Sequence, residues 1–139
     1  RVALDALVGR LPLDGIAVDV QRGAVVDADP DLLAAALLNL LDNSLRHDAK
    51  HARLVAPAAD CVRLHDDGPG VPTARRVALQ TALGDARYEG HTGLGLMLAD
   101  VVARAHGGRL VLPEPEDGHG FAVELRLAAA HEPASLTSR

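Results

Sequence analysis

Apolar residues recur along the chain with two different periods, and each period predicts one kind of secondary structure. The segment from Ile16 to Val20 alternates apolar and polar residues, which is typical of a short strand. From Asp29 to about His47, apolar residues recur every three or four positions, which predicts a helix. Asp29 and Pro30 supply a capping carboxylate and a proline for its first turn. The apolar stripe of this helix consists of Leu33, Leu37, Leu40, Leu41 and Leu45.

The middle of the chain predicts a hairpin followed by a loop and a short helix. Strands are expected near residues 53–56 and 61–65, on either side of a turn that contains Pro57. Two glycines and a proline make residues 66–70 a loop. A helix is then expected from Thr73 to Leu83.

A second long helix and two strands complete the predicted elements. The helix opens on residues 92–96 and ends at the double glycine 107–108, and the closing strands cover residues 109–112 and 121–127. The sum is an α/β fold: a two-layer sandwich with a mixed sheet of about five strands and about three helices on one face.

The same pattern predicts the limits of the domain. We expect residues 15–127 to form one domain, residues 1–14 to lead in from an upstream region, and residues 128–139 to form a flexible tail.

Composition and charge exclude several classes of protein. Hydrophobic residues make up 48% of the chain but aromatic residues only 1%, which leaves no stacking platform for single-stranded nucleic acid. The net charge of −5 disfavours a general nucleic-acid surface. The single cysteine, Cys61, cannot form an internal disulfide or a cysteine-based zinc site. No segment approaches the roughly 18 to 20 apolar residues of a membrane span.

Polar residues follow the other face of the first long helix. They occupy positions i, i+3, i+4, i+7 and i+8 and are Asn39, Asp42, Asn43, Arg46 and His47. Asparagine within a helix costs roughly 0.5 kcal/mol relative to alanine, so two of them one turn apart indicate a use for their amide oxygens. Such oxygens suit a hard cation such as Mg²⁺. A solvated polar face is the alternative, and this helix alone does not decide between them.

Two glycine-containing segments are candidates for ligand contact. In Asp66-Asp67-Gly68-Pro69-Gly70 the glycines allow a close backbone approach, and Asp66 can accept a hydrogen bond from a ligand amino group. Thr92-Gly93-Leu94-Gly95-Leu96 opens a helix, whose free N–H groups suit phosphate. Each segment alone is equally typical of an ordinary turn or a tight connection.

Taken together and in this order, the three segments resemble the N, G1 and G2 boxes of the GHKL, or Bergerat-type, ATP-binding fold. The residues that carry the resemblance are Asn39-Leu40-Leu41-Asp42-Asn43, Asp66-x-Gly68-x-Gly70 and Gly93-Leu94-Gly95-Leu96. Within that superfamily, residues 15–127 look like the catalytic ATP-binding domain of a bacterial sensor histidine kinase. The resemblance implies ATP and Mg²⁺ as cofactors.

The resemblance also implies roles for individual residues. Asn43 would coordinate Mg²⁺ with Asn39 assisting, and Asp66 would accept the adenine amino group. Arg75, Arg76 and Arg87 lie in or beside the segment that matches the ATP lid, where an arginine can neutralise phosphate charge. The implied catalytic set is Asn39, Asn43, Arg46 and His47. The implied ATP-binding set is Asn39, Asn43, Arg46, Asp66, Gly68, Gly70, Arg87, Thr92, Gly93, Leu94, Gly95 and Leu96.

The chain departs from the family pattern at three places. His91 stands where the third segment often has a leading glycine. The phenylalanine-containing F box between the second and third segments is not recognisable. Ala122 stands at a strand position where the family often has a threonine near the adenine.

The function implied by the resemblance is transfer of the ATP γ-phosphoryl group to a histidine on an upstream dimerisation domain, for relay to a response regulator receiver domain. His131-Glu132-Pro133 lacks the basic residue of an acceptor motif, so we expect the acceptor elsewhere in a longer parent chain. The implied domain is monomeric and cytoplasmic and contacts neither nucleic acid nor membrane. Its parent would be a homodimeric sensor of a kind that can be anchored in the inner membrane.

Three other functions stay open. ATP-hydrolysing relatives of the gyrase or mismatch-repair kind place a glutamate base four residues before the metal-binding asparagine. Asn39 occupies that position and cannot abstract a proton from water, which disfavours hydrolysis. Serine kinases of the anti-sigma type share the fold and also tend to carry the glutamate. The missing F box is consistent with a nucleotide-binding module that transfers no phosphoryl group.

Overall fold

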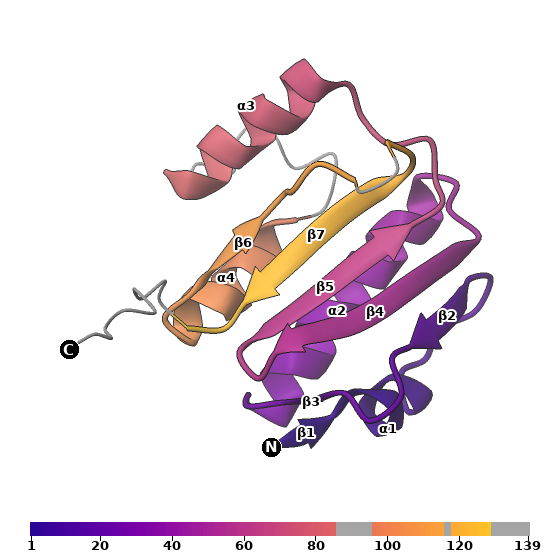
Figure 1. Cartoon of the computed structure of the whole chain (residues 1–139), viewed down its shortest axis with the longest axis vertical. Coiled ribbons are helices and arrows are strands. Elements are labelled where there is room, and N and C mark those ends of the chain that lie inside the picture. Colours follow the sequence, from indigo (N-terminus) through magenta and orange to yellow (C-terminus); the bar gives the residue numbers. More distant parts are fainter. Residues whose placement is uncertain (86–95, 116–117, 129–139) are drawn as a thin grey trace.

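A five-stranded sheet backed by helices forms the body of the protein (Figure 1), as described by a computed structural model for residues 1–85, 96–115 and 118–128. In spatial order, its strands are β2 (Ala17–Val20), β4 (His51–Ala58), β5 (Cys61–Asp66), β7 (Phe121–Arg126) and β6 (Arg109–Val111). The helices are α1 (Leu4–Gly9), α2 (Pro30–Arg46), α3 (Thr73–Gly84) and α4 (Met97–Ala105). The predicted α/β sandwich is confirmed.

The sheet is mixed, as the sequence predicts. Strand β2 runs parallel to β4, and the other three pairs are antiparallel. Parallel neighbours need a crossover connection, and α2 provides it between β2 and β4. The register places Asp66 between Ala52 on β4 and Phe121 on β7.

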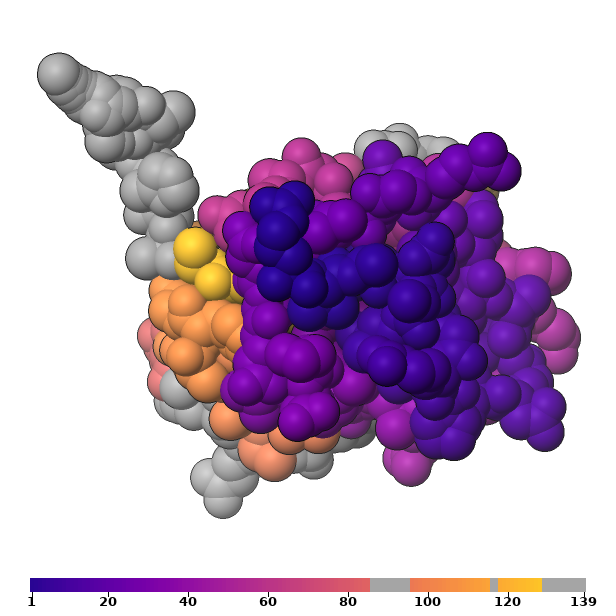
Figure 2. Space-filling model, turned by 90° about the horizontal axis from the view of Figure 1, so that it is seen from below, coloured from indigo at the N-terminus to yellow at the C-terminus, as the bar shows by residue number. Residues whose placement is uncertain are grey.

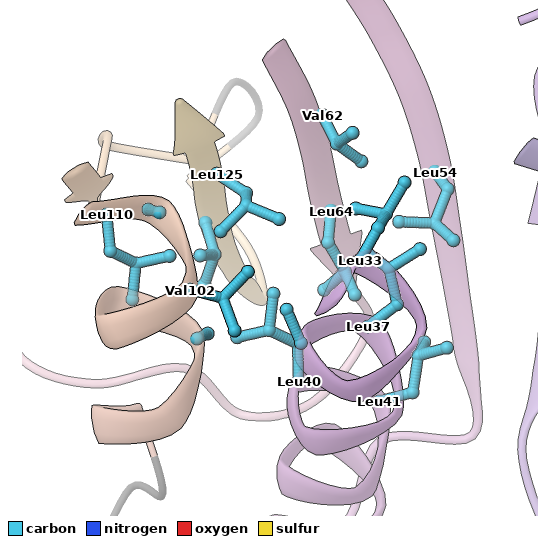
Figure 3. Close-up of a cluster of buried hydrophobic side chains, with 14 of the residues drawn as sticks. Leu33, Leu37, Leu40, Leu41, Leu54, Val62, Leu64, Val102, Leu110 and Leu125 are labelled. Carbon is cyan, nitrogen blue, oxygen red and sulfur yellow. The ribbon is translucent and has the colours of Figure 1, made fainter. Parts of the chain in front are cut away.

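Helices α2 and α4 cover one face of the sheet and enclose the core. Leucines of α2 and Val102 of α4 point toward the inward-facing side chains of the strands (Figure 3). Asp29 begins α2 as predicted, because its carboxylate accepts hydrogen bonds from the backbone N–H groups of Asp31 (2.9 Å) and Leu32 (3.0 Å). The core is aliphatic apart from Phe121, as the composition predicts.

The α3 helix lies along the outer edge of β6 (Figure 1). The Gln80 side chain donates to the carbonyl of Leu110 (3.4 Å) and accepts from the N–H of Leu112 (2.6 Å). Arg76 donates to the carbonyl of Leu112 (3.1 Å), and the buried Asp100 accepts from the N–H of Leu110 (3.1 Å). Side chains therefore satisfy backbone groups that a further strand would otherwise pair.

The N-terminal residues form regular structure that the sequence pattern did not indicate. Strands β1 (Val2–Ala3) and β3 (Val25–Val26) pair antiparallel, and α1 buries Leu4 and Leu7 against the core. This segment (indigo) spreads over one face of the molecule in Figure 2. A helix of six residues is too short for a hydrophobic period to be recognised, so the sequence pattern does not predict it. Leu4 and Leu7 are buried by tertiary contacts with the core. Among the described helices, none has the length and apolar character that spanning a membrane requires.

Candidate functional site

The C-terminal half of α2 carries one buried and one half-buried asparagine. Asn43 is only 6% exposed, and the Oδ1 atom of Asn39 is buried with no hydrogen-bond partner among the described residues. A buried polar atom normally finds a partner, so the Asn39 oxygen is an exception. An unpaired amide oxygen one turn before a second asparagine is an arrangement suited to an external ligand.

The last residues of the predicted polar face lie at the surface. Arg46 forms an ion pair with Asp42, with 3.0 Å between Arg46 Nε and Asp42 Oδ2, and the Arg46 side chain is largely exposed. His47 ends the helix as its C-cap and is exposed. The predicted polar face is therefore divided, because Asn43 is buried while Arg46 and His47 face solvent.

Asp66 ends β5 as a buried carboxylate. It is 6% exposed, and its Oδ1 atom accepts a hydrogen bond from the N–H of Gly68 (3.0 Å). Its other oxygen, Oδ2, has no hydrogen-bond partner in the part of the chain that the structure describes. A buried carboxylate oxygen that is still available can accept from a ligand N–H group.

The glycines that follow Asp66 allow close packing of backbone on backbone. Gly70 has a φ of 76°, and a Cβ atom there would lie 2.5 Å from the carbonyl oxygen of Gly120. A Cβ atom on Gly120 would in turn lie 1.9 Å from the carbonyl oxygen of Asp66. Gly120 is thus part of the same structure, and no sequence motif indicated it, because its requirement arises from a residue on another strand.

Asp67 links the loop of residues 66–70 to the start of β4. Its Oδ1 atom accepts from the N–H groups of Lys50 (2.8 Å) and His51 (2.9 Å), and its Oδ2 atom lies 2.9 Å from Nδ1 of His51. The N–H of Asp67 donates to the carbonyl of His51 (3.1 Å). The backbone hydrogen bonds from His51 and Lys50 lower the pKa of Asp67 to about 2. The sequence motif gave Asp67 no role.

The loop and the end of α2 are neighbours. A Cβ atom built on Gly68 would lie 3.1 Å from the carbonyl oxygen of His47. The N–H of His47 in turn donates a hydrogen bond to the carbonyl of Asn43 in the last turn of α2 (3.2 Å). Asp66 and the two asparagines of α2 therefore belong to two segments in contact, as the three-segment pattern predicts. Leu96 is buried in the core just before α4, so its side chain faces the interior.

Several predicted residues cannot be placed. Arg87, Thr92, Gly93, Leu94 and Gly95 lie outside the described residues. Of the two arginines on α3, Arg75 is exposed and Arg76 is bonded to the edge of β6. Which of these side chains touches a nucleotide stays a prediction.

Phe121, not Ala122, is the β7 residue opposite Asp66. Ala122 is opposite His65 and lines a hollow on the open face of the sheet together with Arg53 and Arg63. The interpretation of Ala122 as an adenine-side residue is one position out of phase, because side chains of a strand alternate between the two faces.

The described residues contain no group of three or more metal-ligating histidine, cysteine, aspartate or glutamate side chains. A transition-metal centre built from such ligands is therefore absent from this part of the chain. The amide oxygens of α2 are a different donor type and suit a hard cation.

The sequence profile of one protein family covers most of the chain. It is described as "Histidine kinase-, DNA gyrase B-, and HSP90-like ATPase" and matches residues 28–131. This chain belongs to that family. The resemblance to the ATP-binding domain of bacterial sensor histidine kinases is confirmed by the relatives that follow.

Curated relatives in this ATPase family are sensor kinases. "Sensor histidine kinase GtrS" of Pseudomonas aeruginosa is 34% identical over 123 residues, which cover 86% of this chain and 24% of that protein. "Sensor protein kinase CarS" of the same species is 42% identical over 105 residues, which cover 71% of this chain and 23% of that protein. The chain thus spans about a quarter of the length of these relatives.

Solved structures share the fold. The ATP-binding domain of PrrB from Mycobacterium tuberculosis superposes with a TM-score of 0.67 at 22% identity, covering 94% of this chain and 96% of that one. The histidine kinase domain of the E. coli osmosensor EnvZ gives a TM-score of 0.61 at 23% identity, covering 98% and 89%. At these identities the likeness concerns the fold alone.

Proposed function

We propose that this chain is the ATP-binding catalytic domain of a two-component sensor histidine kinase. It binds ATP with Mg²⁺ and transfers the γ-phosphoryl group to a histidine on a separate dimerisation domain. The observation that carries the proposal is the unpaired, buried amide oxygen of Asn39, one turn from the buried Asn43, beside a loop that presents an available carboxylate oxygen.

The loop of residues 66–70 is the adenine end of the proposed site. Asp66 Oδ2 would accept a hydrogen bond from the exocyclic amino group of adenine, and Gly68 and Gly70 let the loop pack closely against the backbone around it. Guanine carries a carbonyl oxygen where adenine has this amino group. A carboxylate facing that oxygen is repelled, so the site favours ATP over GTP.

The asparagines are the phosphate end of the proposed site. Their amide oxygens fit a hard cation that retains water and phosphate oxygens as its other ligands, and Asn43 with Asn39 would hold it. Bound there, Mg²⁺ would supply charge neutralisation on the phosphates. Arg46 lies one turn beyond Asn43, and Arg87 and residues 92–96 complete the proposed contacts.

The residue types favour transfer over hydrolysis. Phosphoryl transfer depends mainly on positioning and charge neutralisation, and a neutral imidazole brings its own lone pair as the nucleophile. Attack by water needs a base to orient and deprotonate it, and Asn39 cannot accept a proton from water. His47 is exposed at the end of α2.

The partners follow from the same proposal. The acceptor histidine lies on a dimerisation domain, and the phosphoryl group passes on to a response regulator receiver domain. The domain itself is monomeric, works in the cytoplasm, and belongs to a homodimeric parent that can be anchored in the inner membrane.

Calorimetry with ATP and GTP, each with and without Mg²⁺, tests the binding part. We expect Mg²⁺-dependent ATP binding and at least roughly tenfold weaker GTP binding, equivalent to about 1.4 kcal/mol. Asp66→Asn should reduce that preference. Equal affinities for the two nucleotides would overturn the adenine assignment.

Radiolabel transfer from γ-labelled ATP to a supplied histidine acceptor domain tests the catalytic part. The label should appear on the acceptor domain, and this chain incubated without the acceptor should not become labelled. Steady-state hydrolysis near 1 s⁻¹, roughly the lower end of ordinary turnover, would instead favour the hydrolase.

A further inference from the structure

Several hydrogen bonds fix the position of Asp67, although this residue lies in an exposed loop. Its carboxylate and its N–H together make four hydrogen bonds, all of them to Lys50 and His51. Both Asp67 and His51 are exposed, so these bonds do not compensate for burial. They determine instead where the loop lies.

The two segments joined by these bonds carry the two ends of the proposed site. Asp67 is covalently attached to Asp66, which is the adenine-side carboxylate. His51 begins β4, and Lys50 directly precedes it after the turn that leaves α2, which carries Asn43. Fixing Asp67 to His51 therefore fixes the position of Asp66 relative to the end of α2.

The charged surroundings leave His51 as the direct partner of Asp67. The hollow beside them is lined by Asp19, His51, Arg53, His65, Asp66, Asp67 and His119. Asp19 from β2 is paired with Arg53 of β4. The ring of His65 on β5 lies 2.8 Å from the carbonyl oxygen of His119. Asp67 is thus held by the imidazole and backbone of His51, and not by the nearby arginine.

We propose that Asp67 and His51 are positioning residues that align the adenine-binding carboxylate of Asp66 with the phosphate-binding end of α2. This inference rests on the proposed function. It adds that nucleotide affinity and the preference for adenine both depend on two residues that do not touch the nucleotide.

The pair works whether His51 is neutral or protonated. A neutral imidazole with its proton on Nδ1 donates to the Asp67 carboxylate, and an imidazolium donates as well. An asparagine at position 67 differs. Its oxygen can keep both backbone bonds, but its NH₂ group then faces Nδ1 and needs that nitrogen as an acceptor. An imidazolium has donors on both nitrogens, so the substituted pair fails when His51 is protonated.

The test measures the affinity of this chain for ATP and GTP at about pH 8 and about pH 5.5. The variants are Asp67→Ala and Asp67→Asn. Asp60→Ala is the matched control, because Asp60 lies in the turn at the opposite end of β5. Each dissociation constant is divided by that of the wild type at the same pH, which cancels the protonation of the nucleotide.

We expect Asp67→Ala to weaken ATP binding roughly tenfold at both pH values and to reduce the preference for ATP over GTP. Asp67→Asn should match the wild type within about twofold at pH 8 and weaken binding by about fivefold at pH 5.5. The control should match the wild type throughout. A purely structural role would lower thermal stability without this pH-dependent change in affinity.

The outcomes separate the two proposals. A wild-type chain that binds no nucleotide overturns the proposed function, and the positioning role with it. A wild type that prefers ATP, with Asp67→Asn equal to it at both pH values, overturns the positioning role alone. If Asp67→Ala does not fold, Asp67→Asn alone provides the test, because its loss of affinity at about pH 5.5 but not at about pH 8 is measured against the wild type at each pH.

Discussion

The two ends of the proposed nucleotide site are built in opposite ways. At the loop of residues 66–70, polar groups are paired within the protein: Asp66 accepts from Gly68, and Asp67 is bonded to the start of β4. On α2, the Oδ1 atom of Asn39 is buried and has no partner among the described residues, one turn from the buried Asn43. The loop end is held by its own hydrogen bonds and leaves only Asp66 Oδ2 open, whereas the helix end leaves a buried amide oxygen unpaired.

This difference separates shape from affinity. A loop whose polar groups are already paired keeps its geometry when empty, so it can select the base without being reorganised. An unpaired buried amide costs about 1–3 kcal/mol until something bonds to it. A ligand that bonds to the helix end would therefore remove a free-energy cost that the ligand-free protein carries. The predictions below test the two ends, beginning with the largest effect.

Gly120→Ala should produce the largest loss, because the loop end depends on backbone contact. The new Cβ atom would lie 1.9 Å from the carbonyl oxygen of Asp66. Because both groups belong to the backbone, relieving this clash would cost a large amount of free energy. We expect the free energy of unfolding to fall by about 3 kcal/mol or more in denaturant titrations. Gly118→Ala is the control, because Gly118 has nearly the same positive φ (75°) and no atom within 4 Å of the Cβ position. It should lose only about 1–2 kcal/mol. Equal losses would contradict the close contact.

Asn43→Ala should act on the helix end and leave the loop end intact. ATP binding is expected to weaken roughly tenfold in Mg²⁺ and to lose most of its dependence on the ion. The preference for ATP over GTP should persist, because Asp66 is unchanged. Calorimetry with Mg²⁺ or with a chelator measures both effects, and Asp31→Ala, in the exposed first turn of the same helix, serves as the control. An unchanged Mg²⁺ dependence would count against the metal role.

Asn39→Ala should change stability and binding in opposite directions. Removing an unsatisfied buried amide and adding a better helix former should raise the free energy of unfolding of the ligand-free protein by about 1 kcal/mol. ATP binding should become weaker. Thermal melts with and without nucleotide would reveal a higher melting temperature for the free variant and a smaller increase on ligand addition. A less stable free variant would show that the amide has a structural partner.

Acid should affect the loop end slightly and selectively. The folded pKa of Asp67 is about 2, below the ordinary 3.8, so its contribution is fully present above about pH 4 and is lost as the pH falls toward 2. Between pH 5 and pH 3, the wild type should lose slightly more stability than Asp67→Asn, which has no carboxyl group to titrate. Denaturant titrations at both pH values measure the difference. Identical pH profiles would indicate that the Asp67 bonds do not stabilise the fold.

Local signals in the sequence predicted most of the architecture. The Asp29-Pro30 start, the period of the α2 leucines and the alternation in β5 each report on neighbouring residues, and the structure agrees with all three. The order of the three segments predicted the family, and the resemblance implied that Asp66 and α2 contribute to the same site. Residues 1–14 defeated the same reasoning, because α1 is stabilised by contacts with the core and not by its own pattern.

The parts of the site that the sequence did not predict depend on distant pairs. Gly120 must be a glycine because of the Asp66 carbonyl, and Asp67 matters because β4 begins beside it. The side-chain phase of β7 was also missed by one position at Ala122, because strand register is a tertiary property. Such requirements involve residues far apart in the chain, and a single sequence does not show which residues meet.

The Gln80 side chain has a consequence beyond the folded monomer. By bonding to both Leu110 and Leu112 it acts as a surrogate strand at the end of the sheet. Without it, the Leu110 carbonyl and the Leu112 N–H would lose these bonds, while Asp100 and Arg76 would still pair the Leu110 N–H and the Leu112 carbonyl. Unpaired groups at a sheet edge favour intermolecular pairing. Gln80→Ala should therefore increase aggregation at high protein concentration more than it changes the melting temperature.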